Sequence, residues 1–325
     1  MHEKRYRTFN EHLRKIFGCK VYKVTINPGF TCPNRDGRVA FGGCVYCNNK
    51  GFSPNDFETP IKDQIEKGKA FMRKRYKAEK FIAYFQAYTN TYAPLERLRE
   101  VYDEVLFDND IVGISIGTRP DCVPDSVLDL IASYKEKTAV WIEYGLQSIH
   151  FNTLRCLNRG HGPSEFIDAV LRTKDRNINI CAHVIVGLPG EDISHIIETA
   201  KTLTALQIDS VKVHLIHILK NTLLESMFQQ GKFKPLELHE YVEYVCDFLE
   251  HLSPEILIQR LTADGPKDFM LAPDWASRKF DILNAIDREM EKRGTFQGIK
   301  STLGLRESEL APLSTNVEEV YDKRM

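Results

Sequence analysis

The chain has 325 residues, of which 42% are hydrophobic and 27% are charged, and its formal net charge is −1. That composition is ordinary for a globular protein with a sizeable core, and the charge gives no overall attraction to nucleic acid. No apolar run is long enough to span a bilayer, and the N-terminus lacks the apolar core of a signal peptide. We therefore expect a cytoplasmic protein whose eight cysteines serve metal binding, catalysis or packing rather than disulfides.

The first part of the chain leads into a loop that holds three cysteines. Residues 1–19 predict a short amphipathic helix, and the alternating pattern of residues 20–27 predicts a strand that enters the loop. The loop, residues 28–50, is rich in turn-forming Gly, Pro, Asn and Asp. Its cysteines are Cys32, Cys44 and Cys47. Thiolates on such an irregular backbone can converge on one point.

The cysteine spacing indicates a metal centre with one open coordination position. Closed structural zinc sites usually have four protein ligands, whereas an iron–sulfur cluster with three Cys ligands leaves one iron free. Spacing alone leaves a zinc loop open as an alternative, with a His or another Cys as the fourth ligand. The remaining cysteines are scattered and form no second Cys-x2-Cys, so we expect them to be small packing residues.

After the cysteine loop, helices and short apolar strands alternate. Further strands are predicted at 80–86, 111–117, 139–146, 178–187 and 210–219. Helices are predicted at about 60–77, 94–107, 124–137, within 150–176, and at 193–206. This alternation predicts βαβ units and a parallel sheet, with chemistry at the carboxyl ends of the strands. The six strands fit either a partial barrel or a doubly wound open sheet.

The alternation weakens beyond Thr222. Helices are predicted at about 223–230, 236–251 and 274–293, and residues 255–260 are a candidate additional strand. The segment 265–274 contains two Pro and one Gly and predicts a loop. We expect part of the tail after Gly294 to be mobile.

Polar and glycine-containing motifs follow the predicted strands. They are Gln86-Ala87-Tyr88-Thr89, Thr118-Arg119-Pro120-Asp121, Gly145-Leu146-Gln147-Ser148 and Gly187-Leu188-Pro189-Gly190. Together with Cys-x11-Cys-x2-Cys, they resemble the radical S-adenosylmethionine (SAM) enzymes, in the branch of the elongator catalytic subunit and the MnmL/YhcC group. The resemblance extends from the cysteine loop to Thr222. One departure is Gly117, where the elongator branch usually has a Glu that contacts SAM.

The resemblance implies an α/β fold with a partial (β/α)6 TIM-like barrel of the radical SAM type. Residues 1–222 would form this core, and residues 223–325 a C-terminal helical extension packed on it. The implied cofactors are SAM and a 4Fe–4S cluster, and the implied metal ligands and catalytic residues are Cys32, Cys44 and Cys47. The implied SAM-binding residues are Tyr46, Thr89, Arg119, Gln147, Arg159, His183 and Gly187.

Several of these positions also have a purely structural interpretation. Thr89 suits a helix cap, and Arg119 can pair with Asp121 instead of a SAM carboxylate. Arg159 can be a surface charge at the end of a helix. His183 can be a packed core residue.

The resemblance implies an enzyme that reductively cleaves SAM to a 5′-deoxyadenosyl radical, with an electron from a donor such as flavodoxin or ferredoxin. It also implies a tRNA substrate, in which the carboxymethylaminomethyl side chain of a wobble uridine is converted towards aminomethyl. Two alternatives are a radical SAM enzyme for a small metabolite and a non-catalytic RNA-binding protein with a cluster or zinc. Basic clusters at residues 67–80 and 4–15 either contact RNA phosphates or form solvated helix faces.

Overall fold

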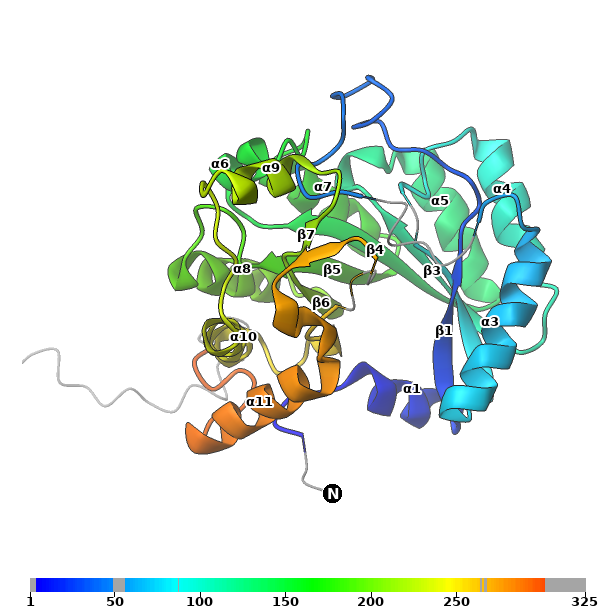
Figure 1. Cartoon of the computed structure of the whole chain (residues 1–325). Coiled ribbons are helices and arrows are strands. Elements are labelled where there is room, and N and C mark those ends of the chain that lie inside the picture. The colour runs from blue at the N-terminus through cyan, green and yellow to red at the C-terminus, as the bar shows by residue number, and fades with distance from the viewer. Residues whose placement is uncertain (1–3, 49–55, 87, 264, 266–267, 302–325) are drawn as a thin grey trace, which may run out of the picture.

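The structure, a computed structural model, describes residues 4–48, 56–86, 88–263, 265 and 268–301. In this part of the chain, seven parallel strands form one sheet in the order β1-β2-β3-β4-β5-β6-β8. The strands are β1 (Val21–Ile26), β2 (Lys80–Phe85), β3 (Ile111–Thr118), β4 (Ala139–Gln147), β5 (Asn179–Val186), β6 (Ser210–Leu215) and β8 (Leu257–Arg260). Figure 1 shows the sheet curled into an open barrel. The predicted partial barrel is confirmed, and a doubly wound sheet is excluded because the strand order never reverses.

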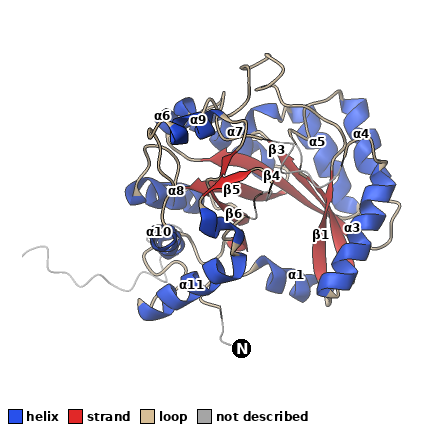
Figure 2. Cartoon of the chain, viewed as in Figure 1, coloured by secondary structure: helices blue, strands red, loops and turns tan. Residues whose placement is uncertain are grey.

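Helices connect the strands, and several of them cover the outer face of the sheet, as Figure 2 shows with helices in blue and strands in red. They are α1 (Phe9–Phe17), α3 (Ile61–Tyr76), α4 (Leu95–Glu104), α5 (Asp125–Ser133), α6 (Phe151–Cys156), α7 (Pro163–Lys174), α8 (Ile193–Ala205), α9 (Leu223–Gln229), α10 (Leu238–His251) and α11 (Lys279–Lys292). Each strand alternates between two environments. In β1, Val24 and Ile26 join the outer core with Ile65 of α3, whereas Val21 and Lys23 face the barrel interior.

The strand predicted at 210–219 is wrong in its second half. β6 covers only the first part of it, and β7 (Ile218–Leu219) pairs antiparallel with β9 (Met270–Ala272), inside the segment predicted as a loop. The N–H of Ile216 donates to the carbonyl of Val186, and beyond this hydrogen bond the chain leaves the sheet. β7 then joins a small apolar cluster that supports the cysteine loop. This cluster consists of Val45, Leu157, Ile185, Leu188, Ile216, Ile218, Leu224 and Ala272.

The additional strand expected at 255–260 is confirmed as β8, which pairs with β6 and raises the sheet from six counted strands to seven in the described chain. The N-terminal segment continues the sheet beyond it. The N–H of Ile258 donates to the carbonyl of Arg7 at 2.8 Å, and Thr8 forms a parallel bridge with Ile258. Helix α1 therefore starts beside β8 and contacts both β8 and β1.

Helix α1 fills the barrel at the amino ends of the strands. The hydroxyl of Thr8 accepts a hydrogen bond from the N–H of Glu11 at the start of the helix, and Gly18, at φ 68°, ends it. Phe9 and Leu13 point inward. They pack with Val21, Ile82, Trp141 and Leu257 of the surrounding strands. The predicted N-terminal helix is confirmed, and its apolar face closes the bottom of the barrel.

In the described part of the chain, no helix combines the length and the apolar character needed to cross a membrane. Residues 295–301 are packed, since the amide of Gln297 donates to the carbonyls of Ser253 and Ile256 at 2.7 and 2.8 Å. The rest of the tail, 302–325, lies outside the described residues. Ala87, in the motif that follows the second strand, and residues 49–50, at the end of the cysteine loop, also lie outside the described residues.

Gly68 tests the packing of α3 on β1. A Cβ at this position would lie 2.3 Å from Cγ1 of Val24, a β-branched side chain with little freedom to rotate. Ala is the better helix former by about 1 kcal/mol. We nevertheless expect Gly68→Ala to lower the free energy of unfolding by about 1–3 kcal/mol, because it overpacks this contact.

Urea denaturation measures the change in Gly68→Ala. Lys67→Ala, at the exposed neighbouring position, is the control and should change the free energy of unfolding by less than about 0.5 kcal/mol. A Gly68→Ala protein that is more stable than the parent would contradict this packing.

Candidate active site

A cavity of about 230 Å³ lies at the carboxyl ends of the strands, beside the cysteine loop. Predicted site residues that line it are Cys32, Cys44, Tyr46, Cys47, Thr89, Arg119, Gln147, Arg159 and His183. Gly187 is not part of this lining. An added Cβ at Gly187 would lie 3.2 Å from Leu236 and 3.3 Å from Ile216, and its φ of 85° favours glycine. Gly187 therefore shapes the turn after β5.

The cysteine loop is held in place by the segment that follows α6. The N–H of Val45 donates to the carbonyl of Leu157 at 3.0 Å. The amide of Asn34 donates to the carbonyl of Asn158 at 2.6 Å and lies 3.6 Å from Sγ of Cys44. These contacts fix the thiols at the cavity, although neither a helix nor a strand carries them.

Two arginines lie beside the cysteines. Nη1 of Arg159 is 3.5 Å from Sγ of Cys44, and Nη2 donates to the carbonyl of Gly145 at 2.6 Å. Arg35 donates to the carbonyl of Cys47 at 2.8 Å. Burial and the neighbouring Cys44 raise the pKa of the Cys47 thiol to about 11, and Arg35 opposes this rise. Because metal ligation needs thiolates, cations at this position favour the ligating form.

Arg119 is buried and already has a carboxylate partner. Its Nε and Nη2 donate to the two oxygens of Asp121 at 2.9 and 2.7 Å, and its Nη1 donates to the carbonyl of Arg159 at 2.9 Å. The pairing with Asp121 is therefore confirmed. It uses Nε and Nη2, the two guanidinium nitrogens that could otherwise bind both oxygens of a SAM carboxylate. Arg159 is 7% exposed, so its interpretation as a surface charge is wrong.

The other predicted residues come from three different segments. The N–H of Thr89 donates to the carbonyl of Thr31 at 3.2 Å, and α4 begins at a Pro94 cap, so Thr89 does not cap it. Gln147 has φ 74° at a bulge that ends β4. Tyr46 packs on the apolar cluster around β7, and burial beside Cys44 raises the pKa of its hydroxyl.

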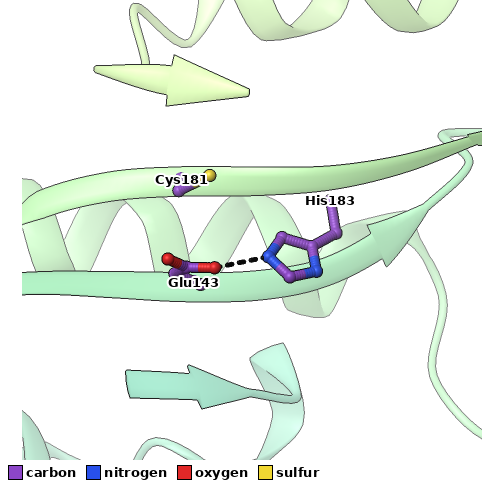
Figure 3. A group of neighbouring side chains, drawn as sticks. All are labelled: Glu143, Cys181 and His183. Carbon is purple, nitrogen blue, oxygen red and sulfur yellow. Dashed lines mark hydrogen bonds and ion pairs between the residues drawn. The ribbon is translucent and has the colours of Figure 1, made fainter. Parts of the chain in front are cut away.

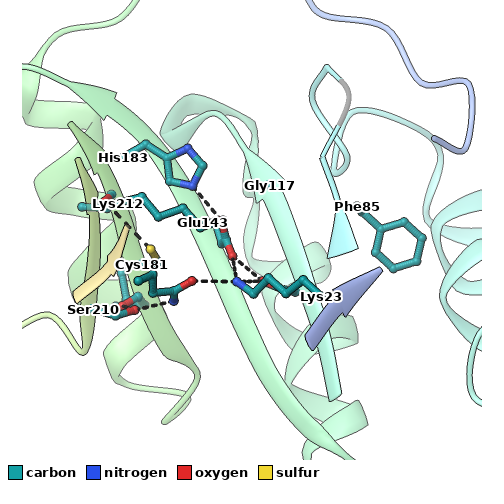
Figure 4. A network of polar contacts seen from close by, with 12 residues as sticks. Lys23, Phe85, Gly117, Glu143, Cys181, His183, Ser210 and Lys212 are labelled. Atoms are coloured by element: carbon teal, nitrogen blue, oxygen red, sulfur yellow. Dashed lines mark hydrogen bonds and ion pairs between the residues drawn. The ribbon is translucent and has the colours of Figure 1, made fainter. Parts of the chain in front are cut away.

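Deeper in the barrel, a layer of charged side chains surrounds Glu143. The fully buried carboxylate of Glu143 forms ion pairs with Lys23 of β1 and Lys212 of β6. It also accepts a hydrogen bond from the hydroxyl of Ser115 at 2.5 Å and lies 2.7 Å from Nε2 of His183. In Figure 4 these groups converge on β4 from both sides. One carboxylate thus links five strands.

The charges in this layer shift each other's pKa. Burial raises the pKa of Glu143, but Lys212, Lys23 and His183 outweigh it and hold that pKa well below its usual range. Burial lowers the pKa of Lys212 to about 7, although Glu143 opposes the shift. Burial also lowers the pKa of His183 to about 4, so this ring is neutral near pH 7. The layer therefore holds one ionised carboxylate between two lysine side chains.

Glu143, Cys181 and His183 resemble a metal site in geometry, since their ligand atoms lie within 4.8 Å of one another (Figure 3). Their chemistry argues against one. Both oxygens of Glu143 already bind ammonium groups, those of Lys23 and Lys212, which would repel a metal cation. Burial, reinforced by Glu143, raises the pKa of the Cys181 thiol to about 12, so it stays protonated. The layer organises charge rather than binding a metal.

The predicted basic clusters lie away from the cavity. Residues 73–77 are at the end of α3 that leads into the amino end of β2, opposite to the cysteine loop (Figure 1). Ion pairs join Lys69 to Asp108, Arg73 and Lys80 to Asp110, Lys4 to Asp287, and Arg7 to Glu255. These contacts favour the interpretation of both clusters as solvated, paired surfaces.

Glu143 and the two lysines that pair with it were not among the predicted site residues. Lys23 and Lys212 each interrupt an otherwise apolar strand, and that interruption was the available signal. Ser115 and Arg260 gave none, since a hydroxyl inside a strand and a cation at its end are both common.

Glu143→Gln tests the charged layer. The amide keeps the shape of the carboxylate but leaves Lys23 and Lys212 buried without a counter-charge. We therefore expect the free energy of unfolding at pH 7 to fall by about 3–5 kcal/mol. Denaturant unfolding of the protein without cofactors measures the loss.

Glu255→Gln is the matched control for Glu143→Gln, because it makes the same change in an exposed ion pair with Arg7. It should cost less than about 1 kcal/mol. Similar small losses at both positions would show that the layer does not hold the strands together.

Comparison with known proteins agrees with this geometry. The profile of the Radical SAM superfamily matches residues 26–203, and that of the Radical SAM C-terminal domain matches residues 208–292. YtqA of Bacillus subtilis is 45% identical over 299 residues, which cover 91% of this chain and 92% of that protein. A tRNA uridine(34) acetyltransferase of Methanocaldococcus infernus is 26% identical over 187 residues, 56% of this chain and 34% of its own length.

The solved structure of archaeal Elp3 from Methanocaldococcus infernus, with an N-terminal deletion, shares the fold. It has a TM-score of 0.61 and 19% identity, and the match covers 85% of this chain and 64% of that one. The superfamily takes its name from SAM, and a 4Fe–4S cluster together with SAM is its cofactor set, as the resemblance implied. The profile match covers more than half of the described chain, and the chain belongs to the Radical SAM superfamily.

Proposed function

We propose that this radical SAM enzyme acts on tRNA and converts the carboxymethylaminomethyl side chain of a wobble uridine towards aminomethyl. The observation that carries the proposal is the similarity to a tRNA uridine(34) acetyltransferase over 187 residues. Position 34 of tRNA is the wobble position. The cavity supports the proposal, because arginines line it and it is open at the carboxyl ends of the strands, where a base that has left its stack can enter.

In this proposal, Cys32, Cys44 and Cys47 hold the cluster, and Arg159 rather than Arg119 faces the carboxylate of SAM. When bound, these cofactors supply the 5′-deoxyadenosyl radical that takes a hydrogen from the substrate. The residues suit this use. None of these three cysteines forms a disulfide in the described chain. Nε of Arg159 and Oδ1 of Asn34 are buried without a hydrogen-bond partner among the described residues, as expected of atoms that a ligand completes.

The rest of the chain would position these groups and exclude water. Tyr46, Thr89, Gln147 and His183 are assigned to the walls of the SAM site. Residues 1–222 would form the core, and residues 223–325 an extension that contributes β8 to the barrel. A carrier such as flavodoxin or ferredoxin would deliver the electron.

The cysteine loop carries groups that suit RNA at the rim of the cavity. Phe41 is 79% exposed, and Arg38 is an exposed cation in the same loop, 5.9 Å from the ring centroid of Tyr92. Exposed aromatic rings stack on unpaired bases, and guanidinium groups contact phosphates. An anticodon loop offers both. The tRNA would therefore approach over the cysteine loop.

Anaerobic reconstitution tests the cluster ligands. Cys32→Ala, Cys44→Ala and Cys47→Ala should each abolish the visible iron–sulfur absorption and the release of 5′-deoxyadenosine from SAM, because the cluster needs all three thiolates. Cys156→Ala, an exposed cysteine outside the cavity lining, is the control and should retain both signals. Stoichiometric zinc without iron in the parent protein would contradict the assignment.

Conversion of tRNA tests the proposed function. Reduced, reconstituted protein with SAM should convert carboxymethylaminomethyluridine in tRNA to aminomethyluridine, as measured by mass spectrometry of the nucleosides. The pair of changes Arg38→Glu and Phe41→Ala should raise KM for tRNA about 10-fold, because a stacking and a phosphate contact are lost.

The matched control is the pair Arg75→Glu and Phe71→Ala, which changes the same residue types on the exposed surface of α3, at the opposite end of the barrel. It should leave KM within about 2-fold of the parent value. Cleavage of SAM without any change in the wobble nucleoside would contradict the proposal and favour a small-metabolite substrate.

A further inference from the structure

Arg260 is the last residue of β8 and lies in the cavity wall with Tyr84 and His214. It is the register partner of Lys212 on the adjacent strand β6. In the part of the chain that the structure describes, its guanidinium has neither a carboxylate nor another hydrogen-bond partner. A partly buried cation of this kind costs free energy unless an anion completes it.

The other charged side chains that line the cavity already have partners. Arg119 binds Asp121, Arg159 contacts Cys44, and Arg35 binds the carbonyl of Cys47. Glu143, the acidic residue in the described lining, is shared between Lys23 and Lys212. The cavity therefore carries surplus positive charge, and among these arginines Arg260 is the one whose side chain makes no hydrogen bond in the described chain.

His214 supplies a second group at this place. Its Nε2 is buried and lacks a hydrogen-bond partner among the described residues. Burial, followed by the nearby His183 and Arg260, lowers the pKa of His214 well below its usual range. The ring is therefore neutral and can donate one N–H. A guanidinium beside such a donor is a built receptor for a planar anion.

We propose that Arg260 and His214 bind the carboxylate at the end of the carboxymethylaminomethyl side chain. This inference rests on the proposed function and names the group that the barrel recognises. A guanidinium holds a carboxylate through two parallel hydrogen bonds, and a site built for such a contact rejects a neutral analogue. The aminomethyl product has no carboxylate, so the same contact separates substrate from product.

SAM also has a carboxylate and is the competing ligand for Arg260. Arg159 is better suited to it, because Arg159 contacts Cys44, one of the proposed cluster ligands. Arg260, on β8, makes no hydrogen bond or ion pair with the cysteine loop in the described chain. The test must therefore separate the binding of SAM from the binding of the substrate.

The experiment compares two substrates with the reconstituted enzyme. One is tRNA with carboxymethylaminomethyluridine, and the other is the same tRNA with the carboxylate converted to a carboxamide. The parent enzyme should prefer the carboxylate by about 10- to 100-fold in KM. Arg260→Gln should lose this preference while cluster content and SAM affinity stay within about 2-fold. Arg278→Gln, an exposed arginine before α11, is the matched control and should keep the preference.

A binding measurement gives a readout without turnover. Calorimetry with the cluster-free protein and a modified anticodon stem-loop should show about 10- to 100-fold weaker binding in Arg260→Gln. The stem-loop that carries aminomethyluridine should bind the parent and the variant alike.

Each outcome decides the matter. An unchanged carboxylate preference in Arg260→Gln overturns the proposal. Loss of SAM affinity in that variant also overturns it and assigns Arg260 to the cofactor. A parent enzyme that cleaves SAM but converts neither tRNA overturns the proposed function itself, and this inference falls with it.

Discussion

The interior of this barrel depends on the buried carboxylate of Glu143. An unpaired carboxylate at this depth would lower the free energy of unfolding by several kcal/mol. The neighbouring strands must therefore place their hydrogen-bond donors at the same height in the barrel as Glu143. Lys23 extends the arrangement across the open side of the barrel. Its ammonium pairs with Glu143 and donates to the amide oxygen of Gln259 at 2.7 Å, which joins β1 and β8, the two edge strands of the sheet. Side chains thus bridge the gap that backbone pairing leaves open.

This layer divides the barrel into three levels with different properties. Below it, Phe9 and Leu13 of α1 close the bottom with apolar contacts. Above it, the cavity and the cysteine loop occupy the carboxyl ends of the strands. Because the bottom is closed, the cavity lies on the side of the barrel that carries the cysteine loop. Because Glu143 is already shared between two lysines, the layer offers the cavity no further negative charge, and Arg260 remains available for an anion.

The end of the barrel that carries the site could be predicted from the sequence, because the carboxyl ends of parallel strands meet at a common edge. The motifs after β2, β3 and β4 and the cysteine loop therefore meet in one cavity. Partners across the barrel could not be predicted, since Lys23 and Glu143 are 120 positions apart and periodicity reports only the face of a strand. The pairing of Arg119 with Asp121, two positions away, was one of the sequence-based interpretations, whereas the contact of Arg159 with Cys44, 115 positions away, could not be predicted. β7 and β9 are too short to produce an alternating pattern of apolar and polar residues in the sequence.

If this enzyme acts on a wobble uridine, the side chain of that uridine reacts inside this cavity. The most direct measurement uses tRNA in which both methylene groups of the carboxymethylaminomethyl side chain carry deuterium. The reduced enzyme is incubated with it and with SAM, and the deuterium content of the released 5′-deoxyadenosine is determined by mass spectrometry. We expect 5′-deoxyadenosine to gain deuterium from this side chain as aminomethyluridine forms. Unlabelled 5′-deoxyadenosine, released while the nucleoside stays unchanged, would contradict it.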